Sequence, residues 1–139
     1  MAERSLVDYV LRGMKGRWAW PVKHADGFTE GVADVSGWIK PAGTVWIELK
    51  ALDKWPVRAT TPVRLALEEL QKEFLWHRRG WLLARVKREY FLFDRFAVRN
   101  DVETEHCTQE AFRKAAKYSW RNSIDWQQFE RAIKRRQYV

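Results

Sequence analysis

The sequence predicts an α/β (α+β) domain in which a mixed central sheet is flanked by helices. Residues 2–15 carry apolar side chains at helical spacing, whereas residues 18–24, 32–39 and 44–51 show strand-like patterns. A second helical pattern separates these three strands from two more, which is typical of a layered domain. With 139 residues, 46% of them hydrophobic and 32% charged, the chain can bury a core without disulfide or metal support.

The first predicted helix covers residues 2–15 and is closed by Gly13 and Gly16. Glu3 shares the inward-facing side of this helix. Its carboxylate is therefore either part of a solvated helix start or directed at a site. In the first strand that follows, Pro21 lacks a backbone donor and marks an edge or irregular strand.

A Pro-Ala-Gly turn at residues 41–43 predicts that the second and third strands form a hairpin. The next helix is expected to start at Thr61 and Pro62, which combine a capping hydroxyl with a proline at the first helical position. It is expected to run to about Arg79 and to stop at Gly80. Its predicted buried stripe consists of Val63, Leu67, Leu70, Phe74 and Leu75.

Two further strands are predicted at residues 81–86 and 90–93, joined by a charged turn. Thr108 is expected to cap a helix over residues 109–120, and Ser123 or Asp125 to start a last helix. The predicted order is thus αβββαββ over residues 1–95. Residues 96–139 are expected to form a C-terminal helical extension that packs on the same domain.

The net charge of +8 favours polyanionic partners, nucleic acid first, although a basic protein can also be basic merely for solubility. The single cysteine, Cys107, cannot form an internal disulfide, and three widely spaced histidines argue against a zinc site. No apolar run approaches the roughly 20 residues that span a bilayer. We therefore expect a soluble, cytoplasmic protein without a membrane partner.

Three charged residues stand where strands should carry apolar side chains. Asp34 lies between valines, and Glu48 and Lys50 end an apolar run. Strand alternation places Glu48 and Lys50 on the same side, and the hairpin can bring Asp34 beside them. The alternative is that Asp34 is a turn residue and the other two form an exposed pair on a polar strand face.

Together these groups suit metal-assisted hydrolysis of a phosphodiester. Two close carboxylates repel each other, and a hard cation such as Mg²⁺ relieves that repulsion. The cation polarises the phosphodiester and lowers the pKa of a bound water. A lysine beside it can orient that water and offset phosphate charge.

Residues 31–34 (Gly-Val-Ala-Asp) followed by residues 47–50 (Ile-Glu-Leu-Lys) resemble the core signature of the PD-(D/E)XK nuclease superfamily. The pattern is most similar to the virus-type replication-repair nucleases, which include phage-type enzymes that cut branched DNA. Ala33 stands where the family usually has proline. The resemblance covers roughly residues 2–94 and implies a restriction-endonuclease-like core.

The resemblance implies a role for each motif residue. Asp34, Glu48 and the main-chain carbonyl of Leu49 would bind Mg²⁺, for which Mn²⁺ would substitute, and Lys50 would position the attacking water. Gln71, on the following helix, would act through the metal ligands or the phosphate. Glu3, on the first helix, would complete the site or hold a second cation.

Phosphate contacts are expected from basic residues near the acidic site. For Arg78 the helix dipole offers an alternative reason, because a cation suits the C-terminal end of a helix. The predicted DNA-binding residues are Lys23, Lys54, Arg58, Arg64 and Arg78.

The leading hypothesis is a structure-selective DNA endonuclease, specifically a Holliday junction resolvase acting as a homodimer on branched DNA. Two symmetric incisions need two active sites, which makes a twofold dimer natural. A flap, fork or nicking nuclease of the same superfamily is the nearest alternative. A DNA-binding module that keeps the fold without catalysis is the alternative outside the enzyme class.

Overall fold

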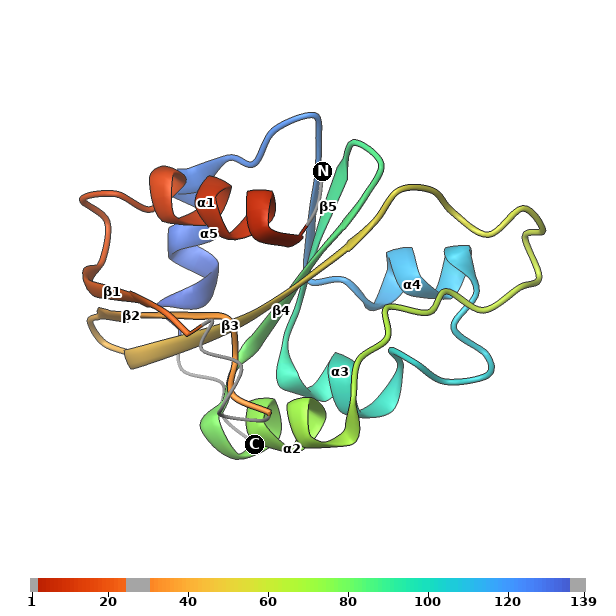
Figure 1. The fold of residues 1–139 in the computed structure, drawn as a ribbon, viewed down its shortest axis with the longest axis horizontal. Coiled ribbons are helices and arrows are strands. Elements are labelled where there is room, and N and C mark those ends of the chain that lie inside the picture. Colours follow the sequence, from red (N-terminus) through yellow and green to blue (C-terminus); the bar gives the residue numbers. More distant parts are fainter. Residues whose placement is uncertain (1–2, 25–30, 136–139) are drawn as a thin grey trace.

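The computed structural model describes residues 3–24 and 31–135, with side chains from Ser5 onward, and a six-stranded mixed sheet runs through these ranges (Figure 1). The strands follow one another in the order β1-β2-β3-β4-β5-β6. The elements are α1 (Glu3–Gly13), β1 (Ala19–Lys23), β2 (Val35–Ile39), β3 (Gly43–Leu52), α2 (Glu69–Arg78), β4 (Trp81–Val86), β5 (Glu89–Phe93), α3 (Arg95–Asn100), α4 (Gln109–Ala115), β6 (Tyr118–Arg121) and α5 (Trp126–Ile133).

Strand β3 is the centre of the sheet. It pairs antiparallel with β2 as a hairpin and parallel with β4, from Ile47 opposite Trp81 to Leu52 opposite Val86. The parallel pair is possible because α2 crosses over between the two strands. All other neighbouring strands are antiparallel. The sequence prediction of a mixed sheet flanked by helices is therefore confirmed.

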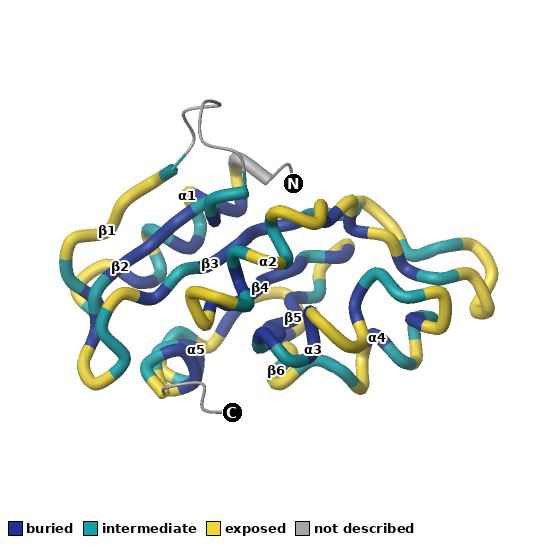
Figure 2. Tube along the Cα trace, turned by 90° about the horizontal axis from the view of Figure 1, so that it is seen from below, coloured by how far each residue is buried: buried dark blue, intermediate teal, exposed yellow. Residues whose placement is uncertain are grey.

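The two faces of the sheet are covered by different helices. In Figure 1, α1 and α5 lie above β1 and β2 on the left, and α3 and α4 lie to the right of β4. Alternate residues of β3 face each side, so Ile47 and Leu49 join a core cluster with α1 and α5. A second cluster joins Leu82 and Ala84 of β4 to α2, α3 and α4. Figure 2 shows that the buried positions follow β2 to β5 through the middle of the molecule.

Helices α1 and α5 contact each other closely. A Cβ atom at Gly13 would lie 1.9 Å from the ring of Trp126, so only glycine allows this approach. The hydroxyl of Tyr9 accepts a hydrogen bond of 2.9 Å from the amide of Ile124. The first and last helices therefore share one layer of the core.

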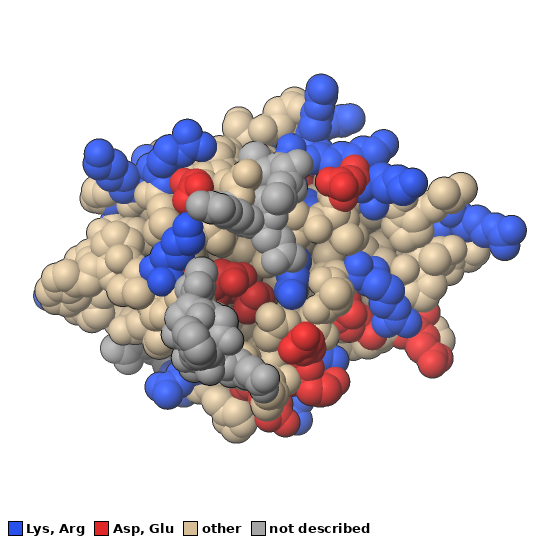
Figure 3. Space-filling model, viewed as in Figure 1, with Lys and Arg blue, Asp and Glu red and all other residues tan. Residues whose placement is uncertain are grey.

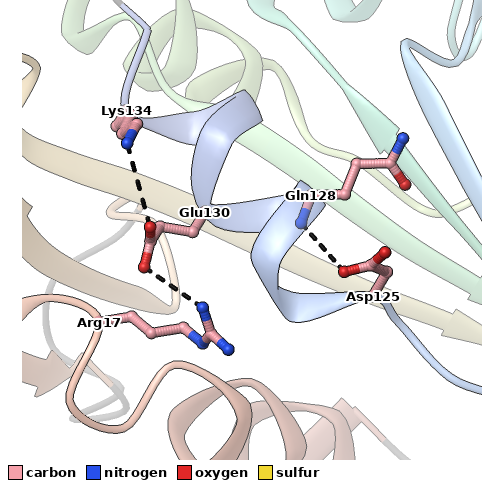
Figure 4. Close-up of polar contacts among 5 residues, drawn as sticks. All are labelled: Arg17, Asp125, Gln128, Glu130 and Lys134. Carbon is pink, nitrogen blue, oxygen red and sulfur yellow. Dashed lines mark hydrogen bonds and ion pairs between the residues drawn. The ribbon is translucent and has the colours of Figure 1, made fainter.

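Polar contacts fix the start and the outer side of α5 (Figure 4). Asp125 is its N-cap, as the sequence allowed, and accepts a hydrogen bond from the amide of Gln128. Glu130 lies between Arg17 at 3.5 Å and Lys134 at 4.0 Å. The contact with Arg17 ties the helix to the segment that follows α1.

The predicted start of the second helix was wrong. Residues 62–68 are not helical, and α2 begins at Glu69. Val63, Leu65 and Leu67 are buried while the residues between them are exposed, so the segment has a period of two. Leu70, predicted to be buried, is 50% exposed.

The end of α2 also differs from the prediction by one residue. Arg79, with a φ of 52°, is the left-handed C-cap, and Gly80 follows it. Gly80 is buried, and a glycine is needed there for a reason other than capping: a Cβ atom would lie 2.5 Å from a methyl group of Leu75. The glycine thus permits the close packing of α2 on the sheet.

The C-terminal extension differs from the prediction because it is not purely helical. The helix that Thr108 caps ends at Ala115, and residues 118–121 form β6. The amide of Lys117 bonds to the carbonyl of Leu92, which starts the ladder between β5 and β6. The short helix α3 was not predicted either.

The first strand follows the prediction made from Pro21. Strand β1 is an edge strand, and its pairing with β2 is irregular between Ala19 and Val22.

Among the helices in the described ranges, none is long and apolar enough to cross a membrane.

Candidate active site

Asp34, Glu48 and Lys50 form a charged cluster where β2 starts. At this point β3 extends beyond the end of its pairing with β2. The last residue pair of this hairpin is Val35 with Ile47. Beyond it, residues 48–52 of β3 pair with β4 on one side only, among the strands that the structure describes. Asp34 immediately precedes Val35 and therefore stands at the open edge of β3.

The Asp34 side chain takes the place of the next main-chain hydrogen bond between β2 and β3. The Oδ2 atom of Asp34 accepts a hydrogen bond of 2.8 Å from the amide of Leu49. The N–H and C=O of one strand residue point to the same side of the strand. The Leu49 carbonyl consequently faces the same open edge as the Asp34 carboxylate.

Glu48 is almost completely buried, with 2% of its surface exposed. Its Oε1 atom lies 3.4 Å from the Nε2 atom of Gln71, which donates a hydrogen bond to it. The Oε1 atom of Gln71 in turn accepts a bond from the amide of Glu68 at the start of α2. Gln71 therefore connects the N-terminus of α2 to the Glu48 carboxylate.

Lys50 is 8% exposed and lies on the same face of β3 as Glu48. Its Nζ atom donates a hydrogen bond of 3.3 Å to the carbonyl of Ala66. Ala66 has a φ of 57°, in the left-handed region. The burial of Glu48 and Lys50 excludes the alternative in which they form an exposed pair on a polar strand face.

The segment that supplies the Ala66 carbonyl is held in place from outside. The amide of Leu65 donates to the Glu103 side chain, and Arg64 donates to the Glu103 carbonyl at 2.6 Å. The amide of Val63 bonds to the carbonyl of Cys107. The contact of Lys50 with Ala66 thus depends on Glu103, which is about 40 positions further along the chain than Arg64 and Leu65.

The donor set available to a metal is small. The described residues contain no group of three or more His, Cys, Asp or Glu side chains that could hold a metal ion. Asp34, Glu48 and the Leu49 carbonyl supply oxygen donors only, which is the chemistry that Mg²⁺ prefers. The residues fit a hard divalent cation that completes its coordination with water, and they do not fit zinc.

The sequence also assigned Glu3 to this site. Its helix, α1, packs against β3 through the core cluster that contains Leu6, Val10, Ile47 and Leu49. The Glu3 side chain itself lies outside the described residues. Its role stays a prediction.

Three of the predicted DNA-binding residues are exposed on the surface, and Lys23 pairs with Val35 next to Asp34. Lys54 and Arg58 are exposed in the loop that follows β3. Lys23, at the end of β1, is exposed and lies 3.8 Å from the Asp8 carboxylate. In the view of Figure 3, acidic atoms lie near the middle of this face, and Lys and Arg side chains are spread over its upper part and its sides.

The other two predicted basic residues are engaged within the protein. Arg64 does not lie on a helix, contrary to the prediction, and it donates to the main chain of Glu103. Arg78, in the last turn of α2, places its guanidinium 5.9 Å from the ring centroid of Phe74. Both are exposed, so each can also contact a phosphate.

His24 was not among the site residues predicted from the sequence. Its amide donates to the carbonyl of Asp34 at 2.8 Å, and its Nε2 atom lies 2.8 Å from the hydroxyl of Ser36. Its ring packs 5.2 Å from that of Trp46. His24, the residue after β1, therefore holds the main chain of Asp34 in place.

No protein-family model matches the chain, and no curated protein matches it.

Proposed function

We propose that the protein is a Mg²⁺-dependent endonuclease that hydrolyses phosphodiester bonds in DNA. The observation that carries this proposal is the burial of Glu48 and Lys50 on one face of β3, next to Asp34 at the open edge of the strand. Burying charged groups is unfavourable unless they are paired, hydrogen-bonded or coordinate a metal ion. Two carboxylates and a lysine beside an open strand edge would supply oxygen ligands for such an ion and a cation next to them.

Each residue has a distinct part in the proposed reaction. Asp34, Glu48 and the Leu49 carbonyl would hold the Mg²⁺ ion, which polarises the phosphodiester and activates water when bound. Lys50 donates hydrogen bonds to the attacking water or to a phosphate oxygen and offsets developing negative charge. Gln71 fixes the orientation of the Glu48 carboxylate through its bond of 3.4 Å.

The sequence pattern of residues 31–34 and 47–50 supports membership of the PD-(D/E)XK superfamily. The order of the first seven elements, αβββαββ, is compatible with that proposal. We further propose branched DNA as the substrate, cut by a homodimer that acts as a Holliday junction resolvase. The net charge of +8 supports a polyanionic substrate.

The test is a cleavage assay with labelled four-way junctions, forks, flaps and linear duplex. Each substrate is incubated with the protein in Mg²⁺, in Mn²⁺ and in EDTA. We expect cleavage of junctions with either metal and none in EDTA. Paired symmetric cuts support a resolvase, and cuts only near fork or flap ends would replace that assignment with a flap or fork nuclease.

Asp34→Ala and Lys50→Ala are the decisive variants, and we expect each to lower the cleavage rate at least about 100-fold. Glu110→Ala and Lys114→Ala are matched controls, because these two residues form an exposed ion pair on α4. Binding without cutting by the unaltered protein, or full cleavage by the Asp34 and Lys50 variants, would refute the proposed active site.

A further inference from the structure

A second group of basic side chains surrounds a pocket at the far ends of β3 and β4. Its lining includes four cations, Arg85, Lys87, Arg88 and Arg121, and two carboxylates, Asp53 and Glu89. The turn between β4 and β5 stands at the top of Figure 1, where Figure 3 shows several blue side chains around a red one. None of the residues predicted to bind DNA belongs to it.

The pocket carries an excess of positive charge. Glu89 is already neutralised from outside, because both of its carboxylate oxygens accept hydrogen bonds from Arg113. Within the described parts of the chain, Arg85, Lys87, Arg88 and Arg121 make no ion pair closer than 4.0 Å. Four cations face two carboxylates, one of which already bonds Arg113 outside the lining, and this excess of positive charge suits an anionic ligand.

Main-chain hydrogen bonds connect the turns that line the pocket. Lys87 and Asn122 both have a positive φ, and each lies in a tight turn. The Asn122 amide donates a hydrogen bond of 2.7 Å to the Arg88 carbonyl, which joins the two turns. The amide of Lys87 bonds to the Leu52 carbonyl at the end of β3. Main-chain contacts between separate strands thus bring the basic residues together around one pocket.

Arg85 is one of the residues that line this pocket. It is half-buried, and its guanidinium lies 5.7 Å from the ring centroid of Tyr90, which restricts its orientation. A planar guanidinium held in this way presents paired donors that match the oxygens of a phosphate.

The pocket lies on the same strands as the candidate active site. Arg85 is opposite Ala51, which directly follows Lys50. Asp53 is three residues beyond Lys50, so about 10 Å of strand separates them. Since neighbouring residues of a strand face opposite sides, Arg85 and Ala51 face the side of the sheet opposite to Lys50. The pocket therefore lies at the end of the sheet and not on the face that carries Glu48 and Lys50.

We propose that this pocket binds a backbone phosphate of DNA outside the active site and so adds to the affinity of the protein for its substrate. The ligand class is a phosphodiester of DNA, recognised by charge and by the Arg85 fork without reading the base. The identity of the ligand rests on the proposed function, whereas the site itself rests on the geometry of the pocket.

The test measures DNA affinity in EDTA, so that no strand is cut, by fluorescence anisotropy of a labelled duplex at several salt concentrations. The variant is Arg88→Glu with Arg121→Glu, both exposed. The matched control is Arg12→Glu with Lys15→Glu, two exposed cations at the end of α1 with the same change in charge. Melting temperatures of both variants establish that they are folded.

We expect the pocket variant to bind roughly tenfold or more weakly than the control variant. The slope of log affinity against log salt should fall by about 0.9 for each phosphate that the variant no longer neutralises. Equal losses in both variants would mean that only net charge matters and would overturn the proposal. Tighter binding of a deoxynucleoside monophosphate than of a short DNA strand would also overturn it.

The outcome is separable from that of the proposed function. A protein that does not cleave DNA in Mg²⁺ but loses affinity in the pocket variant alone would refute the nuclease and keep the pocket. A protein that cleaves DNA and whose two variants bind alike would keep the nuclease and refute the pocket.

Discussion

The Asp34 carboxylate and the Leu49 amide are joined by a hydrogen bond of 2.8 Å, so one residue both ends the β2–β3 ladder and presents a charge at the candidate site. The bond fixes the carboxylate against the main chain of β3 and leaves its second oxygen for another partner. Its structural role and its proposed catalytic role can therefore be separated by substitution.

Asp34→Asn keeps an oxygen that can accept the Leu49 bond but removes the charge. We expect it to retain nearly the stability of the unaltered protein while the cleavage rate falls at least about 100-fold. Asp34→Ala removes both the acceptor and the charge, and its free energy of unfolding should fall by about 1 kcal/mol. Urea unfolding and initial cleavage rates measure the two effects. An active Asn variant would contradict the metal-binding role.

Gln71 links the start of α2 to Glu48, so its loss should affect both stability and metal use. We expect Gln71→Ala to lower the free energy of unfolding by about 1 kcal/mol, because the capping box is lost. The Mg²⁺ concentration at half-maximal cleavage should rise, since Glu48 is no longer oriented. Lys72→Ala, its neighbour on α2, is the control, and the same metal dependence in both variants would argue against the link.

Glu103 holds the segment whose carbonyl contacts Lys50. Glu103→Ala removes the acceptor for the Leu65 amide and should destabilise the fold by about 1–2 kcal/mol. The cleavage rate should fall under conditions in which the variant is fully folded, because the Ala66 carbonyl is no longer fixed. Glu103→Gln keeps an acceptor and is the matched control. Unchanged rates in the Ala variant would show that Lys50 does not depend on this segment.

The Glu89–Arg113 pair predicts a change in stability at acid pH. The hydrogen bond from Arg113 lowers the pKa of Glu89 from its ordinary value of 4.5. Stabilisation by a carboxylate with a lowered pKa is present above its unfolded pKa and is lost as the pH falls through the folded pKa. Since the pair is partly exposed, Glu89→Gln should cost about 0.5–1 kcal/mol at pH 7.

The stability difference between the unaltered protein and Glu89→Gln should shrink as the pH is lowered below about 4.5. Thermal unfolding followed at a series of pH values measures it. Glu110→Gln, in an exposed pair with Lys114, serves as the control and should change stability little at any pH. A difference that grows toward acid pH would reverse the assigned sign.

Strands marked by an apolar run or by a neighbouring turn could be predicted from the sequence. Residues 81–86, predicted as a strand, are β4, and the Pro-Ala-Gly turn at 41–43 lies between β2 and β3 as expected. The hairpin also brought Asp34 to β3 near Glu48. These features are set by neighbours in the chain, which a sequence pattern records directly.

Residues 61–68 could not be predicted from capping signals alone. Thr61 and Pro62 suit a helix start, but the backbone of Val63 and Leu65 bonds to Cys107 and Glu103 instead. The apolar residue at every second position was a visible sign of an extended segment that the helical interpretation overlooked. Long-range partners outweighed local propensity here.

The sixth strand was missed for a similar reason. Residues 118–120 were predicted to continue the helix that starts at Gln109. They lie instead in β6, which pairs with β5. His24 was missed as a site residue because its contact with Asp34 exists only once β1 is paired with β2. In both cases the decisive partner is distant in the sequence.

The contact between the first and last helices bears on how the chain folds during synthesis. The apolar side of α1, including Leu6 and Val10, shares its core cluster with Phe129 and Ile133 of α5. A ribosome releases α1 more than a hundred residues before α5 is made. That layer cannot close until residues 124–133 have emerged, so the apolar side of α1 stays without its native partner while the intervening residues are synthesised.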